Sequence, residues 1–437
     1  MLKNILYIAM TATLLVSCRK DNDPIFEDPD KRLIAQLGEY REMLISAENG
    51  WNAILFPNGG EGFMYHIQFK PDNGVVMFSD FDENTASTSG GGTWRLKALQ
   101  RPTLIFDTYS YLHLPADPDG DISGGTTGVG LQSDFEFYFA EVKNDSVKMK
   151  GLYNGSTMTL VKATKEESDK IKAGALKTMM EENDNFLKNN ENLYISFSDG
   201  KKLQFSMAGK TLSLTWVTNT DEVESISSAF AFTLKGITLK EPLVYGNNVI
   251  KEFLWDDVQK RYYVMVNNTR YDVLNSPVPI IPVYFRFGPG KEFTNITVNV
   301  PTLTGLPPAF MDVYNAAVAG LNALSGRTFN YFIITFTSPT EMTMRLNYRN
   351  TAGTVFNADF NYSVTWTGSD VVDFTFVSRN NNANTAGPGI VALTNYLENN
   401  QFKIDWASNL TPGSTALLAG FYRLNATNDY FFGVLGK

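Results

Sequence analysis

The chain has 437 residues, enough for two or three domains, and its 43% hydrophobic and 19% charged residues are typical of a folded globular protein. The formal net charge of −9, without any basic run, argues against nucleic acid and anionic lipid as partners. One cysteine, Cys18, and two histidines, His66 and His113, exclude a disulfide, a cysteine-ligated metal in the folded body and a three-histidine zinc site.

The N-terminus has the pattern of a bacterial lipoprotein signal. One positive charge precedes the apolar segment 5–16, which is too short to span a bilayer comfortably. Ser17 and Cys18 complete a lipobox, so residues 1–17 are predicted to be a signal peptide and Cys18 to carry the membrane-anchoring lipid. The polar residues 18–29 are predicted to form a tether. Acidic residues soon after the cysteine resemble the export signal of Bacteroidota surface lipoproteins, which favours the outer membrane and the cell surface.

Residues 30–164 are predicted to form a helix and a first β domain. Leu33, Leu37, Tyr40 and Leu44 recur at helical spacing. From residue 51 onward the hydrophobic pattern changes to period two, in about eight short segments separated by glycine- and asparagine-containing turns. This pattern predicts an antiparallel meander, closed as a barrel or folded as a sandwich.

Residues 165–275 are predicted to repeat this order, with one helix and a second β domain. Thr164 and Glu167 have the spacing of a capping box at the start of that helix. Strand-like segments then follow as far as Leu274.

A proline-rich boundary opens the last predicted domain, residues 276–437, which is expected to be α+β with a helix near Pro308–Leu324. The predicted fold class is therefore mostly β. It comprises two or three antiparallel meander barrels or sandwiches, with a lipocalin-like barrel among the compatible forms, and a few connecting α-helices.

Asp117, Asp119 and Asp121 place carboxylates at alternate positions of a loop after the fifth predicted strand. Such a run can supply three of the six to eight oxygen ligands that Ca²⁺ needs, and Gly120 lets the backbone bend between them. The loop departs from the EF-hand pattern, so the remaining ligands would have to come from elsewhere. The alternative is a solvated acidic loop in which Asp and Gly serve turn geometry. Calcium is the one cofactor that the sequence suggests.

Other carboxylates could serve ligand binding or sugar hydrolysis. Asp134 and Glu136 are the candidates for a ligand site, and Asp80, Asp82 and Glu83 could contribute to an acid pair. The alternative is that these residues are solvated strand ends. The sequence has no His-Glu-x-x-His, nucleophile elbow, phosphate loop or dinucleotide fingerprint, so no catalytic residue is assigned.

Several segments resemble a known family. They are Arg101–His113, Asp117–Gly120, Gly130–Phe137 and Lys235–Leu243, together with Gly50-Trp51 and the lipobox. In these segments the chain is similar to a family of Bacteroidota outer-membrane lipoproteins catalogued as a domain of unknown function. The resemblance extends over nearly the whole mature chain. It implies association with TonB-dependent outer-membrane transporters and their partner lipoproteins. It implies no established activity.

The leading hypothesis is a non-enzymatic, lipid-anchored envelope or cell-surface protein that binds a ligand or assists a transporter in nutrient uptake. The competing hypothesis is a surface hydrolase that acts on glycan or peptide through carboxylates. A third is a purely structural accessory of a transporter. A transporter recovered with the protein from intact envelopes would favour an accessory role, and a retained glycan or peptide would favour ligand binding.

Overall fold

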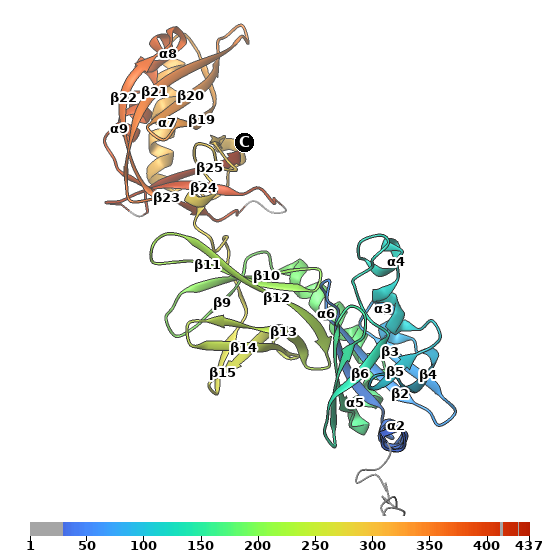
Figure 1. The fold of residues 1–437 in the computed structure, drawn as a ribbon. Helices are drawn as coiled ribbons and strands as arrows, with labels where there is room; N and C mark the ends of the chain where they lie inside the picture. The colour runs from blue at the N-terminus through green and yellow to red at the C-terminus, as the bar shows by residue number, and fades with distance from the viewer. Residues whose placement is uncertain (1–28, 411–413, 427) are drawn as a thin grey trace, which may run out of the picture.

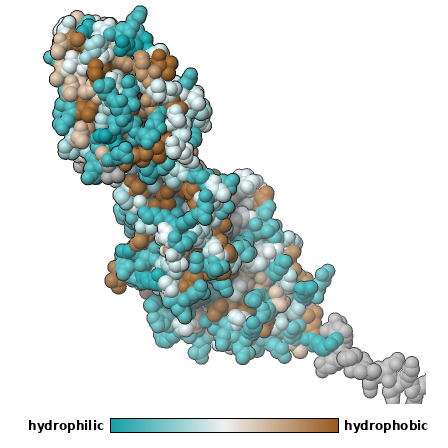
Figure 2. Space-filling view, turned by 90° about the vertical axis from the view of Figure 1, so that its left-hand side faces the viewer, coloured by the Kyte–Doolittle hydropathy of each residue, from teal (hydrophilic) through white to brown (hydrophobic). Residues whose placement is uncertain are grey.

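The computed structural model describes residues 29–410, 414–426 and 428–437. The predicted signal peptide, Cys18 and nearly all of the predicted tether lie outside these residues. Strands make up 45% and helices 23%, which confirms the mostly β fold class. Three β units follow one another in chain order along an elongated molecule, with the third unit beyond the second (Figure 1). The face drawn in Figure 2 is mainly hydrophilic, with scattered hydrophobic residues.

The first unit is a closed antiparallel barrel of eight strands, preceded by helix α2 (Pro29–Ile45). The strands are β1 (Trp51–Phe56), β2 (Phe63–Phe69), β3 (Gly74–Ser79), β4 (Gly90–Ala98), β5 (Pro102–Phe106), β6 (Glu136–Val142), β7 (Ser146–Gly151) and β8 (Thr157–Lys162). Pairing of β1 with β8 closes the barrel. The strand order β1 to β8 is that of a meander, as the period-two pattern predicts.

The interior of this barrel is filled by side chains. Trp51, Tyr65 and Trp94 are 0% exposed and belong to one cluster with the other inward-facing residues. An eight-stranded barrel is just wide enough either to be filled by its own side chains or to hold one small ligand. Large aromatic side chains fill this barrel, so it has no room for an internal ligand cavity like that of a lipocalin.

Two helices, α5 (Lys165–Lys172) and α6 (Ala175–Asn189), lead into the second unit. Thr164 and Glu167 make the predicted capping box. The prediction of one continuous helix is wrong, because Gly174 adopts a left-handed conformation at φ 88° and separates the two helices.

The second unit is a nine-stranded antiparallel sheet that curves into a ring. Its strands are β9 (Leu193–Ser196), β10 (Lys202–Ala208), β11 (Thr211–Val217), β12 (Val223–Thr233), β13 (Gly236–Tyr245), β14 (Asn248–Asp256), β15 (Arg261–Val266), β16 (Thr269–Asp272) and β17 (Leu274–Asn275). In space β16 and β17 are the two ends of the sheet, and β17 pairs with β9. The ring is therefore not closed, because β16 pairs with β15 and with no other strand that the structure describes. We call this unpaired edge, which faces β9, the seam.

The third unit is again a closed eight-stranded barrel, with pairing of β18 and β25. Its strands are β18 (Asn295–Val298), β19 (Thr328–Ser338), β20 (Glu341–Arg349), β21 (Val355–Thr367), β22 (Val371–Arg379), β23 (Phe402–Ala407), β24 (Leu418–Arg423) and β25 (Tyr430–Gly436). The helices α7 (Pro308–Ala323), α8 (Asn381–Ala386) and α9 (Val391–Glu398) accompany it.

Short helical segments occupy several connections: α3 (Glu83–Ser87), η1 (Tyr111–Ala116), α4 (Gly120–Ser123), η2 (Val283–Phe285), η3 (Val300–Thr302) and η4 (Gly387–Gly389). The period-two pattern does not predict them. None of the helices in the described part of the chain has the length and apolarity needed to cross a membrane.

Candidate functional site: a basic groove on the first barrel

A groove of about 580 Å³ crosses the outer wall of the first barrel. It lies over β5 and β6, between the β4–β5 turn and the turn that follows β7. Its lining residues are Leu99, Gln100, Arg101, Thr103, Tyr138, Leu152 and Tyr153. The lining thus combines one cation with two tyrosine rings and two leucine side chains.

The strand register brings further positive charge to this groove. Thr103 pairs with Tyr138, and Tyr138 pairs with Lys150 on the next strand. Directly opposed residues point to the same face of a sheet, so Lys150 stands beside Tyr138. Lys97 lies one strand away on the other side, opposite Thr103. The guanidinium of Arg101 lies over the ring of Tyr138, 4.9 Å from its centroid.

These cations lack an anionic partner within the chain. Lys97, Arg101 and Lys150 are exposed, and none forms an ion pair with another residue that the structure describes. An arginine stacked on a tyrosine keeps its planar edge of N–H donors free to bind a carboxylate in a bidentate manner. The groove therefore has the chemistry to bind a ligand that carries an acidic group and a flat or apolar body.

Asp134 shapes this groove without contributing a free carboxylate to it. The side chain is 2% exposed, and Oδ1 accepts the N–H groups of Tyr153 and Asn154 at 2.8 and 2.9 Å. Oδ2 accepts the N–H of Ser156 at 2.9 Å. The backbone oxygen of Glu136 accepts the N–H of the residue before Tyr153. Asp134 thus fixes the turn that presents Tyr153, which is 76% exposed, to the groove.

The predicted calcium loop is held by local hydrogen bonds. Asp117 accepts hydrogen bonds from the hydroxyl of Tyr109 and the N–H of Asp119. Asp119 in turn accepts the N–H of Asp121 and caps α4. Within residues 29–410, 414–426 and 428–437, no three His, Cys, Asp or Glu side chains are grouped so that they could hold a metal ion. In this structure the carboxylates of Asp117 and Asp119 shape the turns of the loop, and calcium binding there stays a prediction.

Both histidines are held by neighbouring side chains, His113 by ring stacking and His66 by hydrogen bonds. His113 stacks between Tyr109 and Phe135, with centroid distances of 5.6 and 4.6 Å. His66 Nδ1 lies 2.9 Å from Asn52 Oδ1, and its Nε2 lies 3.1 Å from the hydroxyl of Ser168. Burial lowers the pKa of His66 to about 4, with a further contribution from a nearby lysine.

His66 lies between Ser168 and Asn52, and a serine beside a histidine that a third residue orients is also the arrangement of an activated nucleophile with its general base. Ser168, however, is 1% exposed and lies inside α5, against the barrel. No substrate can reach that hydroxyl in this structure. The cluster therefore joins α5 to the first barrel through satisfied polar groups.

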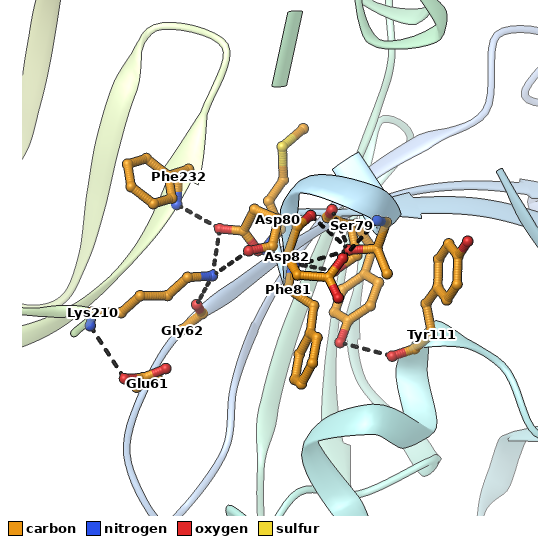
Figure 3. Close-up of polar contacts among 12 residues, drawn as sticks. Glu61, Gly62, Ser79, Asp80, Phe81, Asp82, Tyr111, Lys210 and Phe232 are labelled. Atoms are coloured by element: carbon orange, nitrogen blue, oxygen red, sulfur yellow. Dashed lines mark hydrogen bonds and ion pairs between the residues drawn. The ribbon is translucent and has the colours of Figure 1, made fainter. Parts of the chain in front are cut away.

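Asp80 belongs to the junction between the first barrel and the second unit (Figure 3). Its Oδ2 lies 2.8 Å from Lys210 Nζ and accepts the N–H of Phe232, while Oδ1 accepts the N–H of Met64. Lys210 Nζ also donates to the backbone oxygens of Asp80 and Gly62. Burial raises the pKa of Asp80, and the positive charge of Lys210 opposes that shift.

The neighbouring carboxylates are also engaged. Asp82 caps α3 by accepting the N–H of Thr85 at 2.7 Å, and Glu83 lies 3.5 Å from Lys177 Nζ. Most of the carboxylates considered for sugar hydrolysis therefore serve as helix caps, turn supports or ion-pair partners.

The basic groove was not recognised from the sequence, because Lys150 and Tyr138 lie far along the chain from Lys97 and Arg101. Lys150 and Tyr138 come beside Thr103, Lys97 and the β4–β5 turn only through the pairing of β4 to β7. The one available signal was the position of Tyr138 and Lys150 on the outward-facing phase of two adjacent predicted strands.

A family model described as a domain of unknown function, DUF4302, matches residues 22–257, just over half of the chain. No curated protein matches the sequence. Among solved structures, the octameric penicillin-binding protein homologue from Pyrococcus abyssi is 12% identical with a TM-score of 0.16, and the match covers 33% of this chain and 36% of that chain. This chain thus spans about a third of that protein's length.

The DNA polymerase III β sliding clamp from Bartonella birtlesii is 8% identical with a TM-score of 0.13, over 93% of this chain and 97% of that chain. The Helicobacter pylori β clamp in complex with carprofen is 10% identical with a TM-score of 0.13, over 92% and 98%. The groove and the Asp80–Lys210 junction both fall within residues 22–257. On the extent of the family match, the chain belongs to the DUF4302 family of proteins with a domain of unknown function.

Proposed function

We propose that this protein is a lipid-anchored lipoprotein of the Bacteroidota outer membrane, displayed at the cell surface through Cys18, which binds a carboxylate-bearing ligand without transforming it. In this role it assists a TonB-dependent transporter in nutrient uptake. The lipobox and the acidic residues that follow it support the location. The resemblance to transporter-associated lipoproteins supports the partner.

The observation that carries the binding proposal is the cluster of unpaired cations around Tyr138. Arg101 lies over the ring of Tyr138 and Lys150 is its cross-strand neighbour, and both stand on a protein of negative net charge. A local positive site on a negatively charged protein selects ligands by complementary charge. Tyr138 and Tyr153 add ring faces that bury the apolar part of such a ligand.

A hydrolase is the less favoured reading. Asp80 and Asp134 are buried and bound to backbone N–H groups, so neither is placed to transfer a proton to a substrate. A ligand bound in the groove would meet the side chains of Arg101, Tyr138 and Tyr153, with Lys150 beside Tyr138.

Binding is tested with the double variant Arg101→Ala/Lys150→Ala. Trigalacturonate and a short aspartate-rich peptide serve as carboxylate-bearing probes in isothermal titration calorimetry. We expect saturable binding of at least one probe by the wild type, and a loss of roughly tenfold or more in the variant, since charge-assisted bonds contribute about 1.5–3 kcal/mol each.

The matched control is Lys188→Ala/Arg349→Ala, which removes the same charges from exposed positions outside the groove. Equal weakening in both variants, or binding of neither probe, contradicts the assignment of the groove. Anchoring is tested separately with Cys18→Ala. This variant should leave the membrane fraction, and protease treatment of intact cells should remove the wild-type protein.

A further inference from the structure

The second unit has a cavity of about 480 Å³ at one end of its ring-like sheet. Three hairpin turns meet there: β9–β10, β13–β14 and β15–β16. Its lining includes both Phe197, which follows β9, and Tyr271 on β16, so it lies at the seam where β16 is not hydrogen-bonded to β9. Cavities at the mouths of barrels are common ligand sites.

Aromatic rings form the base of this cavity. Phe197 stacks with Tyr245 at a centroid distance of 5.8 Å and meets Tyr271 edge-on at 4.9 Å. Trp216 meets the Tyr245 ring edge-on at a centroid distance of 5.0 Å. The hydroxyl of Tyr245 donates to Asp199 Oδ2 at 2.7 Å, which fixes the orientation of the ring. The base is thus a rigid set of rings with one phenol group held by a carboxylate.

The rim of the cavity carries free amides and no positive charge. The side chains of Asn247, Asn248 and Asn267 line it, and none of them makes a hydrogen bond with a residue that the structure describes. An asparagine side chain offers both donors and an acceptor. Asp199 supplies the one formal charge among the lining residues. An anionic ligand would therefore meet a carboxylate and no cation.

We propose that this cavity binds a neutral saccharide. A hexopyranose ring has an apolar C–H face that packs on an aromatic ring and a periphery of hydroxyl groups that both donate and accept hydrogen bonds. Tyr245 and Tyr271 match the first feature. The three amides of Asn247, Asn248 and Asn267 and the carboxylate of Asp199 match the second. The basic groove of the first barrel shares no lining residue with this cavity, and the ligand proposed for that groove is anionic rather than neutral.

The test measures binding of maltotetraose, cellotetraose and mannotetraose to the full-length protein by calorimetry, with trigalacturonate as the anionic comparison. Asn247→Ala/Asn267→Ala removes two rim amides from exposed positions, and Tyr245→Ala removes the central ring. Loss of one or two hydrogen bonds predicts roughly tenfold weaker binding of a neutral tetrasaccharide in the double variant. Tyr245→Phe, which keeps the ring, should weaken binding less than Tyr245→Ala.

Asn58→Ala/Asn144→Ala is the matched control, because these asparagines are exposed in hairpin turns of the first barrel. Melting curves establish that each variant is folded. If Tyr245→Ala does not fold, the asparagine variant decides. Binding of a neutral tetrasaccharide that is weakened by the rim variant and not by the control supports the proposal. Absence of binding at millimolar concentration, equal binding by the rim variant, or binding of trigalacturonate alone overturns it.

Discussion

Replacing Lys210 by methionine should strongly destabilise the junction between the first barrel and the second unit. The ammonium group of Lys210 is fully used: Nζ donates to Asp80 Oδ2 and to the backbone oxygen of Asp80 at 2.8 Å each, and to the backbone oxygen of Gly62 at 3.1 Å. It also lies 4.2 Å from the centroid of the Phe63 ring. Methionine fills a similar volume but leaves the carboxylate of Asp80 buried without a counter-charge.

The expected loss is about 3–5 kcal/mol in the free energy of unfolding, as is usual when one partner of a buried ion pair is removed. Two backbone N–H groups, from Met64 and Phe232, still bind the carboxylate and keep the loss from being larger. Burial already raises the pKa of Asp80, and Lys210 is the group that opposes this shift. In the variant the folded-state pKa therefore rises further above the unfolded value. Its stability deficit should shrink as the pH falls and grow as the pH rises.

Urea denaturation at several pH values measures this effect. Lys170→Met is the matched control, because it makes the same substitution in an exposed ion pair with Glu166, and it should change stability little. The double variant Asp80→Asn/Lys210→Met should recover part of the loss, since it removes the uncompensated charge. The reasoning fails if Lys210→Met costs less than about 1 kcal/mol, or if the double variant is no more stable than the single one.

Three further predictions concern the first barrel and its helix α5. Because the folded-state pKa of His66 is lowered to about 4, the unfolded chain binds more protons below pH 6.5, and stability should fall by about 3 kcal/mol as the pH drops from 6.5 to 4. In His66→Gln the melting temperature should depend less on pH between 6.5 and 4. The same pH dependence as in the wild type would contradict the lowered pKa of His66. Asp134→Asn should cost about 1–3 kcal/mol in urea unfolding and weaken probe binding in the groove, because Asp134 oxygens accept three backbone N–H groups. Melting curves with millimolar calcium and with chelator test the calcium prediction: an upward shift that Asp119→Ala abolishes supports it, and the absence of a shift contradicts it.

The sheets were the most predictable part of the fold. Alternation such as Trp51, Ala53 and Leu55, all buried, is a local signal that needs no knowledge of the partner strand. The predicted elements differed from the structure where the hydrophobic pattern was weak or compatible with more than one structure. The strand Asn295–Val298 has only four residues and lies in a proline- and glycine-rich stretch. At Gly174, one residue in a left-handed conformation divides a helix whose apolar face looked continuous.

Sites were much less predictable, because they depend on pairing between distant strands. Asp80 and Lys210 are 130 residues apart, and no local pattern marks either as an ion-pair partner. Asp134 was recognised as a candidate for ligand binding from its residue type, whereas its three backbone partners give it a supporting role. A carboxylate in a turn has the same sequence appearance in both cases, and only its burial and its hydrogen bonds distinguish them.

The filled interior of the first barrel determines where binding sites can lie. Eight strands enclose a space that the side chains of Trp51, Tyr65 and Trp94 largely occupy, so a ligand of any size must bind outside the barrel or at an open end. The groove lies on an outer wall, where strand register sets Lys150 beside Tyr138 and the β4–β5 turn places Arg101 over the same ring. In the second unit the sheet is not closed at β16, and the cavity lies among the turns beside that seam. The filled interior of the first barrel therefore accounts for a groove on its outer wall, and the unclosed edge at β16 accounts for the cavity in the second unit.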